Sequence, residues 1–258
     1  MSLRHPLSTL RHYGYLLHYA LVRANYQRRL IATTKRVGQT KFRSYELFNR
    51  HGKDVLLQAL LLNLDDGDVV VDVGANTGTY TLAAAADAPS VEVVAVEPNP
   101  NVASQLQANV EANPFDDRVR ILTCGLGDAD ETREFHLSNY DELGSFSSAH
   151  ASAWEAQVVD TAQVSMRSLD SLVDSDAVPP PDHLKIDVEG YGVNVLRGAE
   201  SVLRDYRPTV YFERHDARGR YDESAAKNLL REAGYELVPV REGWVCEPAA
   251  TTTTSHSV

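Results

Sequence analysis

Cysteine and long apolar runs are scarce in this chain of 258 residues, which has only two cysteines, Cys124 and Cys246. They form no CxxC pair, so we expect neither a disulfide framework nor a zinc site, and their scarcity fits a reducing compartment. No run approaches the roughly 18–20 apolar residues that span a bilayer. The N-terminus lacks the apolar segment and cleavage site of a signal peptide. These absences predict a cytoplasmic protein without a bound metal.

Lysine is also rare, with 5 residues against 20 arginines, and 36 acids give a net charge of −11. The charge is uneven, because residues 1–53 carry 11 of the 25 basic residues and a single acid, Glu46. An acidic, lysine-poor surface resembles that of halophilic proteins, whose net charge keeps them soluble. On this hypothesis, molar KCl stabilises the fold, and an unfolding series in which KCl has no such effect would refute it.

The basic segment 1–43 is predicted to be a helical N-terminal arm, rich in arginine and tyrosine. From Leu10 to Ile31 the apolar residues recur at mixed helical spacings. One interpretation is an amphipathic helix on an anionic membrane, with tyrosines at the interface. The interpretation that we favour is a helix that packs on the domain and presents arginine to solvent. Nucleic-acid binding is not expected, because the rest of the chain would repel phosphate.

Two phosphate-binding signatures are missing, the G-x-G-x-x-G of dinucleotide sites and the Gly-Lys-Ser/Thr of triphosphate sites. In their place stands VVVDVGANTGTY at residues 69–80, a β-branched strand that runs into a glycine-rich turn. The turn offers Asp72, Gly74, Asn76 and Gly78, and glycine there lets the backbone approach a ligand. A loop without a basic residue suits a ligand without pyrophosphate, such as S-adenosylmethionine. The alternative is an ordinary glycine turn.

A second apolar strand at residues 91–96 ends in Glu97-Pro98-Asn99-Pro100. An acid about 20 residues beyond the glycine loop, at the end of the next strand, can hold a ribose diol. The alternative is an acid that favours the positive end of the following helix. Because loop and acid occur together, we predict a cofactor site at these two strand ends.

From residue 68 onward, strand and helix patterns alternate as in a doubly wound, mostly parallel sheet. We expect strands at 68–73, 91–96, 118–123, 183–188 and 207–213, and helices at 45–64, 78–87, 100–112, 169–173 and 224–233. Short extra strands at 131–137 and 162–167 flank a polar segment, 138–160, which is either a lid or a disordered insertion. An antiparallel hairpin at 235–240 and 243–247 closes the domain of residues 44–248, and residues 249–258 form a disordered tail.

Four acids follow predicted strands and should meet at one rim, namely Asp72, Glu97, Asp187 and Glu213. Methyl transfer requires alignment of the acceptor, and a hydroxyl acceptor also requires a base. The candidate catalytic residues are Asp187, Glu189, Glu213 and His215. Each also has a structural alternative, since Asp187 can pair with Lys185 or cap a helix and Glu213 can pair with a nearby arginine.

Six segments together resemble the FkbM-type S-adenosylmethionine-dependent methyltransferases: VVVDVGANTGTYTL, VEVVAVEPNP, the LGD after the third strand, SLDSL, LKIDVEGYGVNVLRGAESVL and RPTVYFERH. The resemblance covers roughly residues 68–240. It implies a Rossmann-like class I methyltransferase with a seven-stranded sheet. It assigns the cofactor loop and ribose site to residues 72–97 and places Asp128 near the adenine. Many members have a second acid after Glu189-Gly190, where this chain has Tyr191-Gly192.

The resemblance implies an O-methyltransferase whose acceptor is a hydroxyl of a glycan, glycolipid or small natural product, or a sugar carboxylate. A lipid-linked glycan on the inner membrane face would suit the basic arm at residues 1–40. Two alternatives remain, an NAD-dependent oxidoreductase on a Rossmann-like fold and a non-catalytic cofactor-binding or scaffold protein. Fold does not separate the three.

Overall fold

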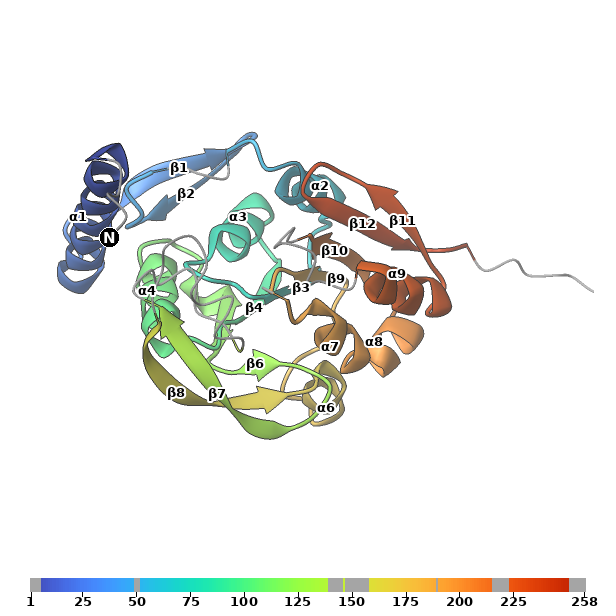
Figure 1. The fold of residues 1–258 in the computed structure, drawn as a ribbon. Coiled ribbons are helices and arrows are strands. Elements are labelled where there is room, and N and C mark those ends of the chain that lie inside the picture. The colour runs from blue at the N-terminus through green and yellow to red at the C-terminus, as the bar shows by residue number, and fades with distance from the viewer. Residues whose placement is uncertain are drawn as a thin grey trace, which may run out of the picture.

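A seven-stranded sheet forms the centre of the computed structural model, which describes residues 6–48, 52–138, 146, 158–188, 190–214 and 223–250 (Figure 1). Five strands are parallel and adjacent, in the order β10 (Thr209–Glu213), β9 (His183–Ile186), β3 (Val69–Val73), β4 (Glu92–Val96) and β5 (Val119–Leu122). Two more complete one edge, where β12 (Gly243–Pro248) runs antiparallel to β10 and pairs with β11 (Tyr235–Pro239). The predicted fold class is confirmed, including the C-terminal antiparallel hairpin.

Helices cover both faces of this sheet, because successive residues of each buried strand point to opposite sides. Val70 packs in the cluster that includes residues of α2 (Val55–Asn63), α3 (Thr79–Asp87) and α4 (Pro100–Glu111). Val71 packs in the opposite cluster, which includes residues of α6 (Leu169–Asp174), α7 (Gly192–Arg197), α8 (Glu200–Asp205) and α9 (Glu223–Glu232). A parallel sheet buried on both faces is thus built from near-continuous valine runs.

A smaller sheet lies at one side, with the order β6 (Gly125–Leu126), β8 (Val158–Arg167) and β7 (Glu131–Ser138). A 3-10 turn at Asp116–Arg118 precedes β5. Both extra strands were predicted, but β8 begins at Val158 and so takes up the end of the predicted 138–160 loop. Except for Phe146, residues 139–157 lie outside the described part of the chain, as do residues 251–258 of the predicted tail.

The N-terminal segment differs from the prediction, because it is only partly helical. After α1 (Pro6–Arg28), a hairpin of β1 (Thr33–Val37) and β2 (Thr40–Ser44) follows, with Gly38 at φ +56° in its turn. Buried and exposed residues alternate along both strands, a pattern that favours strand over helix. The helix predicted at 45–64 is also too long, since it begins at Val55, where the Asp54 carboxylate caps it by accepting from the Leu57 N–H at 3.0 Å.

The second half of α1 packs on the domain, as our favoured interpretation of the arm requires. Val22 and Tyr26 lie in a buried cluster with Ala108 of α4, and Figure 1 shows α1 beside α4. Leu17 and Leu21, one helical turn apart, remain 63% and 54% exposed. Among the described residues, no helix combines the length and apolar character needed to cross a bilayer.

Candidate functional site

The register of the parallel strands brings four strand ends side by side. Val73 at the end of β3 pairs with Val96 of β4 and with Ile186 of β9, and Ile186 pairs with Phe212 of β10. The loops that leave these strands therefore share one edge of the sheet, where ligands of open α/β sheets bind. The structure brings together the sequence positions that were expected to form this rim.

Two glycines of the loop after β3 have a positive φ and lie close to neighbouring groups. Gly74 has φ +75°, and a Cβ there would lie 1.9 Å from the carbonyl oxygen of Asp187. Gly78 has φ +94°, and a Cβ would meet Leu106 of α4 at 2.3 Å. Asn76 between them also has a positive φ, 50°, which asparagine tolerates better than most residues. The loop therefore packs closely against the residue that follows β9 and against α4.

The Glu97 carboxylate ties this loop to the start of α4. Its Oε2 accepts from the Asn76 N–H at 3.0 Å, and its Oε1 accepts from the Asn99 N–H at 2.8 Å. Burial raises the pKa of Glu97 to about 7, although both N–H groups favour the charged form and oppose that shift. Each carboxylate oxygen has a second lone pair that can accept a hydrogen bond from a hydroxyl. The two oxygens could therefore bind the two hydroxyls of a ribose.

The raised pKa of Glu97 predicts pH-dependent cofactor binding, because only the carboxylate can accept both ribose hydroxyls. We expect the dissociation constant of S-adenosylhomocysteine to rise as the pH falls below about 7, approaching tenfold per pH unit well below that pKa. Calorimetric titrations between about pH 5.5 and 8.5 would measure this. The Glu97→Gln variant should bind more weakly with a flat profile, and a flat profile in the unmodified protein would contradict the assignment.

Asp72 lies under the loop rather than open to the rim, and it is fully buried. Its Oδ2 accepts from the Thr81 N–H at 3.1 Å and from the Thr81 hydroxyl at 2.6 Å. Its Oδ1 lies 3.0 Å from the ammonium of Lys185. Both oxygens thus contact the chain itself, so Asp72 holds the loop onto the start of α3. Its predicted contact with the cofactor stays a prediction.

Lys185 is the buried cation of the site, and the sequence indicated only its pairing with Asp187. Its ammonium donates to the Gly74 carbonyl at 3.1 Å and lies 3.0 Å from Asp72 and 3.3 Å from the Asp187 carboxylate. Burial alone lowers the pKa of Lys185, but Asp72, Asp187 and Glu213 outweigh it and raise the pKa above its ordinary value. The lysine therefore stays charged and joins β9 to the loop after β3.

Sequence reasoning missed two further polar residues at this edge, Tyr80 and Asp54. The buried Tyr80 hydroxyl donates to Asp54 Oδ1 at 3.0 Å, and Lys185 Nζ lies 4.7 Å from the centre of the Tyr80 ring. Burial, followed by the charge of Asp54, raises the pKa of Tyr80. Tyr80 lies inside the 69–80 motif, but nothing in the sequence indicated its contact with Asp54, 26 positions earlier in the chain.

The other predicted site residues are placed less completely. The Asp187 side chain is 29% exposed beside Lys185, and Glu213 is half-buried at the end of β10. Asp128 is exposed and accepts a hydrogen bond from the Asn194 amide at 3.2 Å. Glu189 and His215 lie outside the residues that the structure describes. Their catalytic roles stay predictions.

Comparisons with known proteins found similarity to methyltransferases. A family model described as a methyltransferase FkbM domain matches residues 72–237. "Methyltransferase 1" of Beauveria bassiana is 30% identical over 193 residues, which cover 69% of this chain and 76% of that protein. The hexuronic acid methyltransferase AglP of Haloferax volcanii is 30% identical over 182 residues, covering 70% and 69% respectively. A crystal structure of a methyltransferase FkbM from Methylobacillus flagellatus has a TM-score of 0.50 at 17% identity, over 73% of this chain and 45% of that one.

Proposed function

Because the chain belongs to the FkbM methyltransferase family, we propose that it transfers a methyl group from S-adenosylmethionine to an oxygen of a glycan, glycolipid or small natural product. The observation that carries this proposal is the Glu97 carboxylate, which is held at the rim by the N–H groups of Asn76 and Asn99. A ribose diol needs such an acceptor beside a closely approachable loop.

The residues present fit S-adenosylmethionine. The glycine loop has no lysine or arginine between Asp72 and Tyr80, so its composition suits a ligand without phosphate. Gly74, Asn76 and Gly78 keep the backbone of the loop free of bulky side chains. The Glu97 carboxylate can accept hydrogen bonds from the ribose hydroxyls. A dinucleotide would call for the G-x-G-x-x-G pattern, which is absent here.

When bound, S-adenosylmethionine supplies an activated methyl group, so alignment of the acceptor is the main task of the protein. Glu97 and the loop of residues 74–78 would hold the cofactor, which would supply its methyl carbon to the acceptor oxygen and keep the electron pair of the broken carbon–sulfur bond on sulfur. A hydroxyl acceptor also gives up its proton, for which Asp187 and Glu213 at the rim are the described candidates. A carboxylate acceptor needs no base.

The acceptor class is supported by the similarity to a protein named hexuronic acid methyltransferase. We propose a sugar acceptor, methylated on a hydroxyl or on a carboxylate. The family membership argues against the alternative of an NAD-dependent oxidoreductase. A non-catalytic cofactor-binding protein would have the same fold but would form no methylated product.

Calorimetric titration with S-adenosylhomocysteine and, separately, with NAD tests the proposal. We expect S-adenosylhomocysteine to bind and NAD not to bind, in low salt or in molar KCl. Asp72→Ala and Glu97→Ala should weaken binding, while Glu92→Ala, at an exposed position at the start of β4, should not. Binding of NAD instead, or normal binding by the Glu97→Ala variant, would overturn the site assignment.

Peripheral contact of residues 1–40 with an anionic membrane on the cytoplasmic side is also a proposal. It is supported by the basic charge of the segment and by the exposed Leu17 and Leu21 of α1. Co-sedimentation with phosphatidylserine vesicles should exceed that with phosphatidylcholine vesicles and should fall in the Leu17→Ser/Leu21→Ser double variant. Equal sedimentation with both lipids would count against it.

A further inference from the structure

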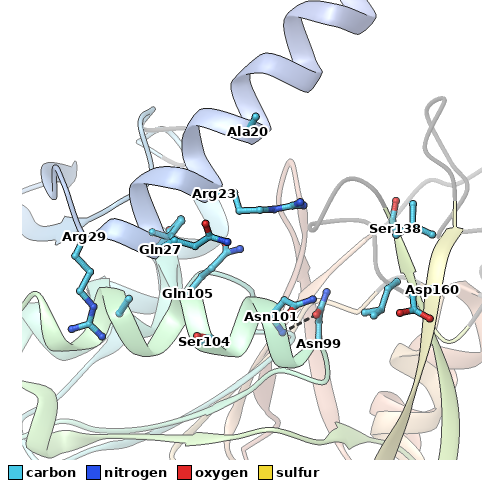
Figure 2. A pocket seen from close by; sticks show the side chains of 14 residues that line it. Ala20, Arg23, Gln27, Arg29, Asn99, Asn101, Ser104, Gln105, Ser138 and Asp160 are labelled. Carbon is cyan, nitrogen blue, oxygen red and sulfur yellow. Dashed lines mark hydrogen bonds between the residues drawn. The ribbon is translucent and has the colours of Figure 1, made fainter.

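A groove of about 900 Å³ lies between α1, α4 and the paired ends of β7 and β8. Figure 2 shows its three walls, with side chains of all of them directed toward the space between. This volume is at the upper end of the range for ligand pockets. Its polar lining residues include Arg23, Gln27, Asn101, Ser104, Gln105 and Asp160.

The lining of the groove suits a sugar. Primary amides come from both helices, Gln27 on α1 and Asn101 and Gln105 on α4. An amide can both donate to and accept from a hydroxyl. On the opposite wall, Leu137 is half-buried and Val159 is exposed, and these aliphatic groups can pack against the C–H face of a sugar ring. This combination of amides and small apolar groups matches a polyhydroxylated ligand.

Two arginines and one aspartate line the groove, so its lining can bind a ligand that carries a negative group. Figure 2 shows Arg23 extending from α1 toward Ser138 and Asp160 on the other wall. A guanidinium binds a carboxylate through two parallel hydrogen bonds. Arg29 also lines the groove, and its guanidinium lies 2.6 Å from the Glu111 carboxylate. Asp160 and the net charge of −11 oppose a doubly charged phosphate more strongly than a carboxylate.

The groove adjoins the predicted cofactor site through Asn99. Its backbone N–H donates to Glu97 at 2.8 Å, while the residue itself lines the groove. We propose that this groove binds the acidic sugar chain of the methyl acceptor and that Arg23 contacts a carboxylate on it. The inference rests on the proposed function, and it adds the acidic character of the acceptor and the surface that binds it.

Two arginines of α1 provide a matched pair for the test. Arg23 lines the groove, whereas Arg28 is exposed on the same helix and does not line it. We would titrate the unmodified protein, Arg23→Gln and Arg28→Gln with a glucuronate-terminated disaccharide in the presence of saturating S-adenosylhomocysteine. We expect Arg23→Gln to weaken this binding about tenfold or more, as for the loss of a charge-assisted hydrogen bond, and Arg28→Gln to change it little.

Binding of S-adenosylhomocysteine, measured first, separates the two proposals, because Arg23→Gln should leave it unchanged. If S-adenosylhomocysteine does not bind to the unmodified protein, the proposed function itself is refuted. If this binding is normal, three results would overturn the groove assignment: no binding of the acidic disaccharide, equal weakening by both arginine variants, or equal affinity for the glucose-terminated counterpart. Tighter binding of glucose 1-phosphate than of the glucuronate disaccharide would overturn the choice of a carboxylate.

Discussion

Replacing Gly74 with alanine should destabilise the protein by about 2–5 kcal/mol and abolish cofactor binding, since it combines a strained backbone with a steric clash. The new Cβ would lie 1.9 Å from the Asp187 carbonyl oxygen, a backbone atom that cannot rotate away. Relief of the clash requires the loop after β3 to separate from β9. The free energy of unfolding from urea titration and the affinity for S-adenosylhomocysteine would measure both effects.

Gly38 provides a matched control for this substitution. It also has a positive φ, +56°, but a Cβ there would meet nothing within 4 Å. Gly38→Ala should therefore show only the backbone cost, about 1–2 kcal/mol, with normal cofactor binding. Similar losses of stability in the two variants would show that the contact between Gly74 and Asp187 is unimportant.

Replacing Lys185 with methionine should cost about 3–5 kcal/mol of stability, because it leaves the fully buried Asp72 carboxylate without its cation. The loop should also lose its hold on β9, so we expect weaker binding of S-adenosylhomocysteine. Thermal and urea unfolding, together with calorimetric titration, would test both. Lys41→Met, at an exposed position in β2, should change neither quantity appreciably.

A double-mutant cycle identifies the cause of that loss. Asp72→Asn combined with Lys185→Met removes both charges, and the amide oxygen that the first substitution introduces could still accept from Thr81. The double variant should be more stable than the sum of the two single losses predicts, with a coupling of about 1–3 kcal/mol. Strict additivity would mean that the two residues do not stabilise each other.

The sheet could be predicted because each of its strands has a recognisable pattern in the local sequence. The valine run at 69–73 and the glycine turn after it mark a buried parallel strand and its loop. The hairpin at 33–44 was missed because a basic, tyrosine-rich arm suggested a helix throughout, although Thr33, Val37 and Thr40 around Gly38 carried a strand signal. The composition of a segment can thus suggest a helix where the alternation of buried and exposed positions indicates a hairpin.

For the site, sequence indicated which residues lie at the rim but not which atoms they contact. Asp72 was expected to accept hydrogen bonds from the loop or from a ligand, and the structure shows that its two oxygens contact Thr81 and Lys185. The partnership of Tyr80 with Asp54 depends on where α2 begins, which the predicted helix at 45–64 placed about ten residues too early. Such contacts between distant segments follow from packing and leave no periodic pattern in the chain.

The contacts of Lys185 have a consequence for the thermodynamics of ligand binding. Its ammonium is held by two carboxylates and one carbonyl that all belong to the chain itself. The dipoles and charges of this part of the rim are therefore ordered during folding, and binding need not reorient them. Such preorganisation lowers the entropic cost of association. The packing of the folded protein already orders these groups, so the binding free energy of the ligand need not do so.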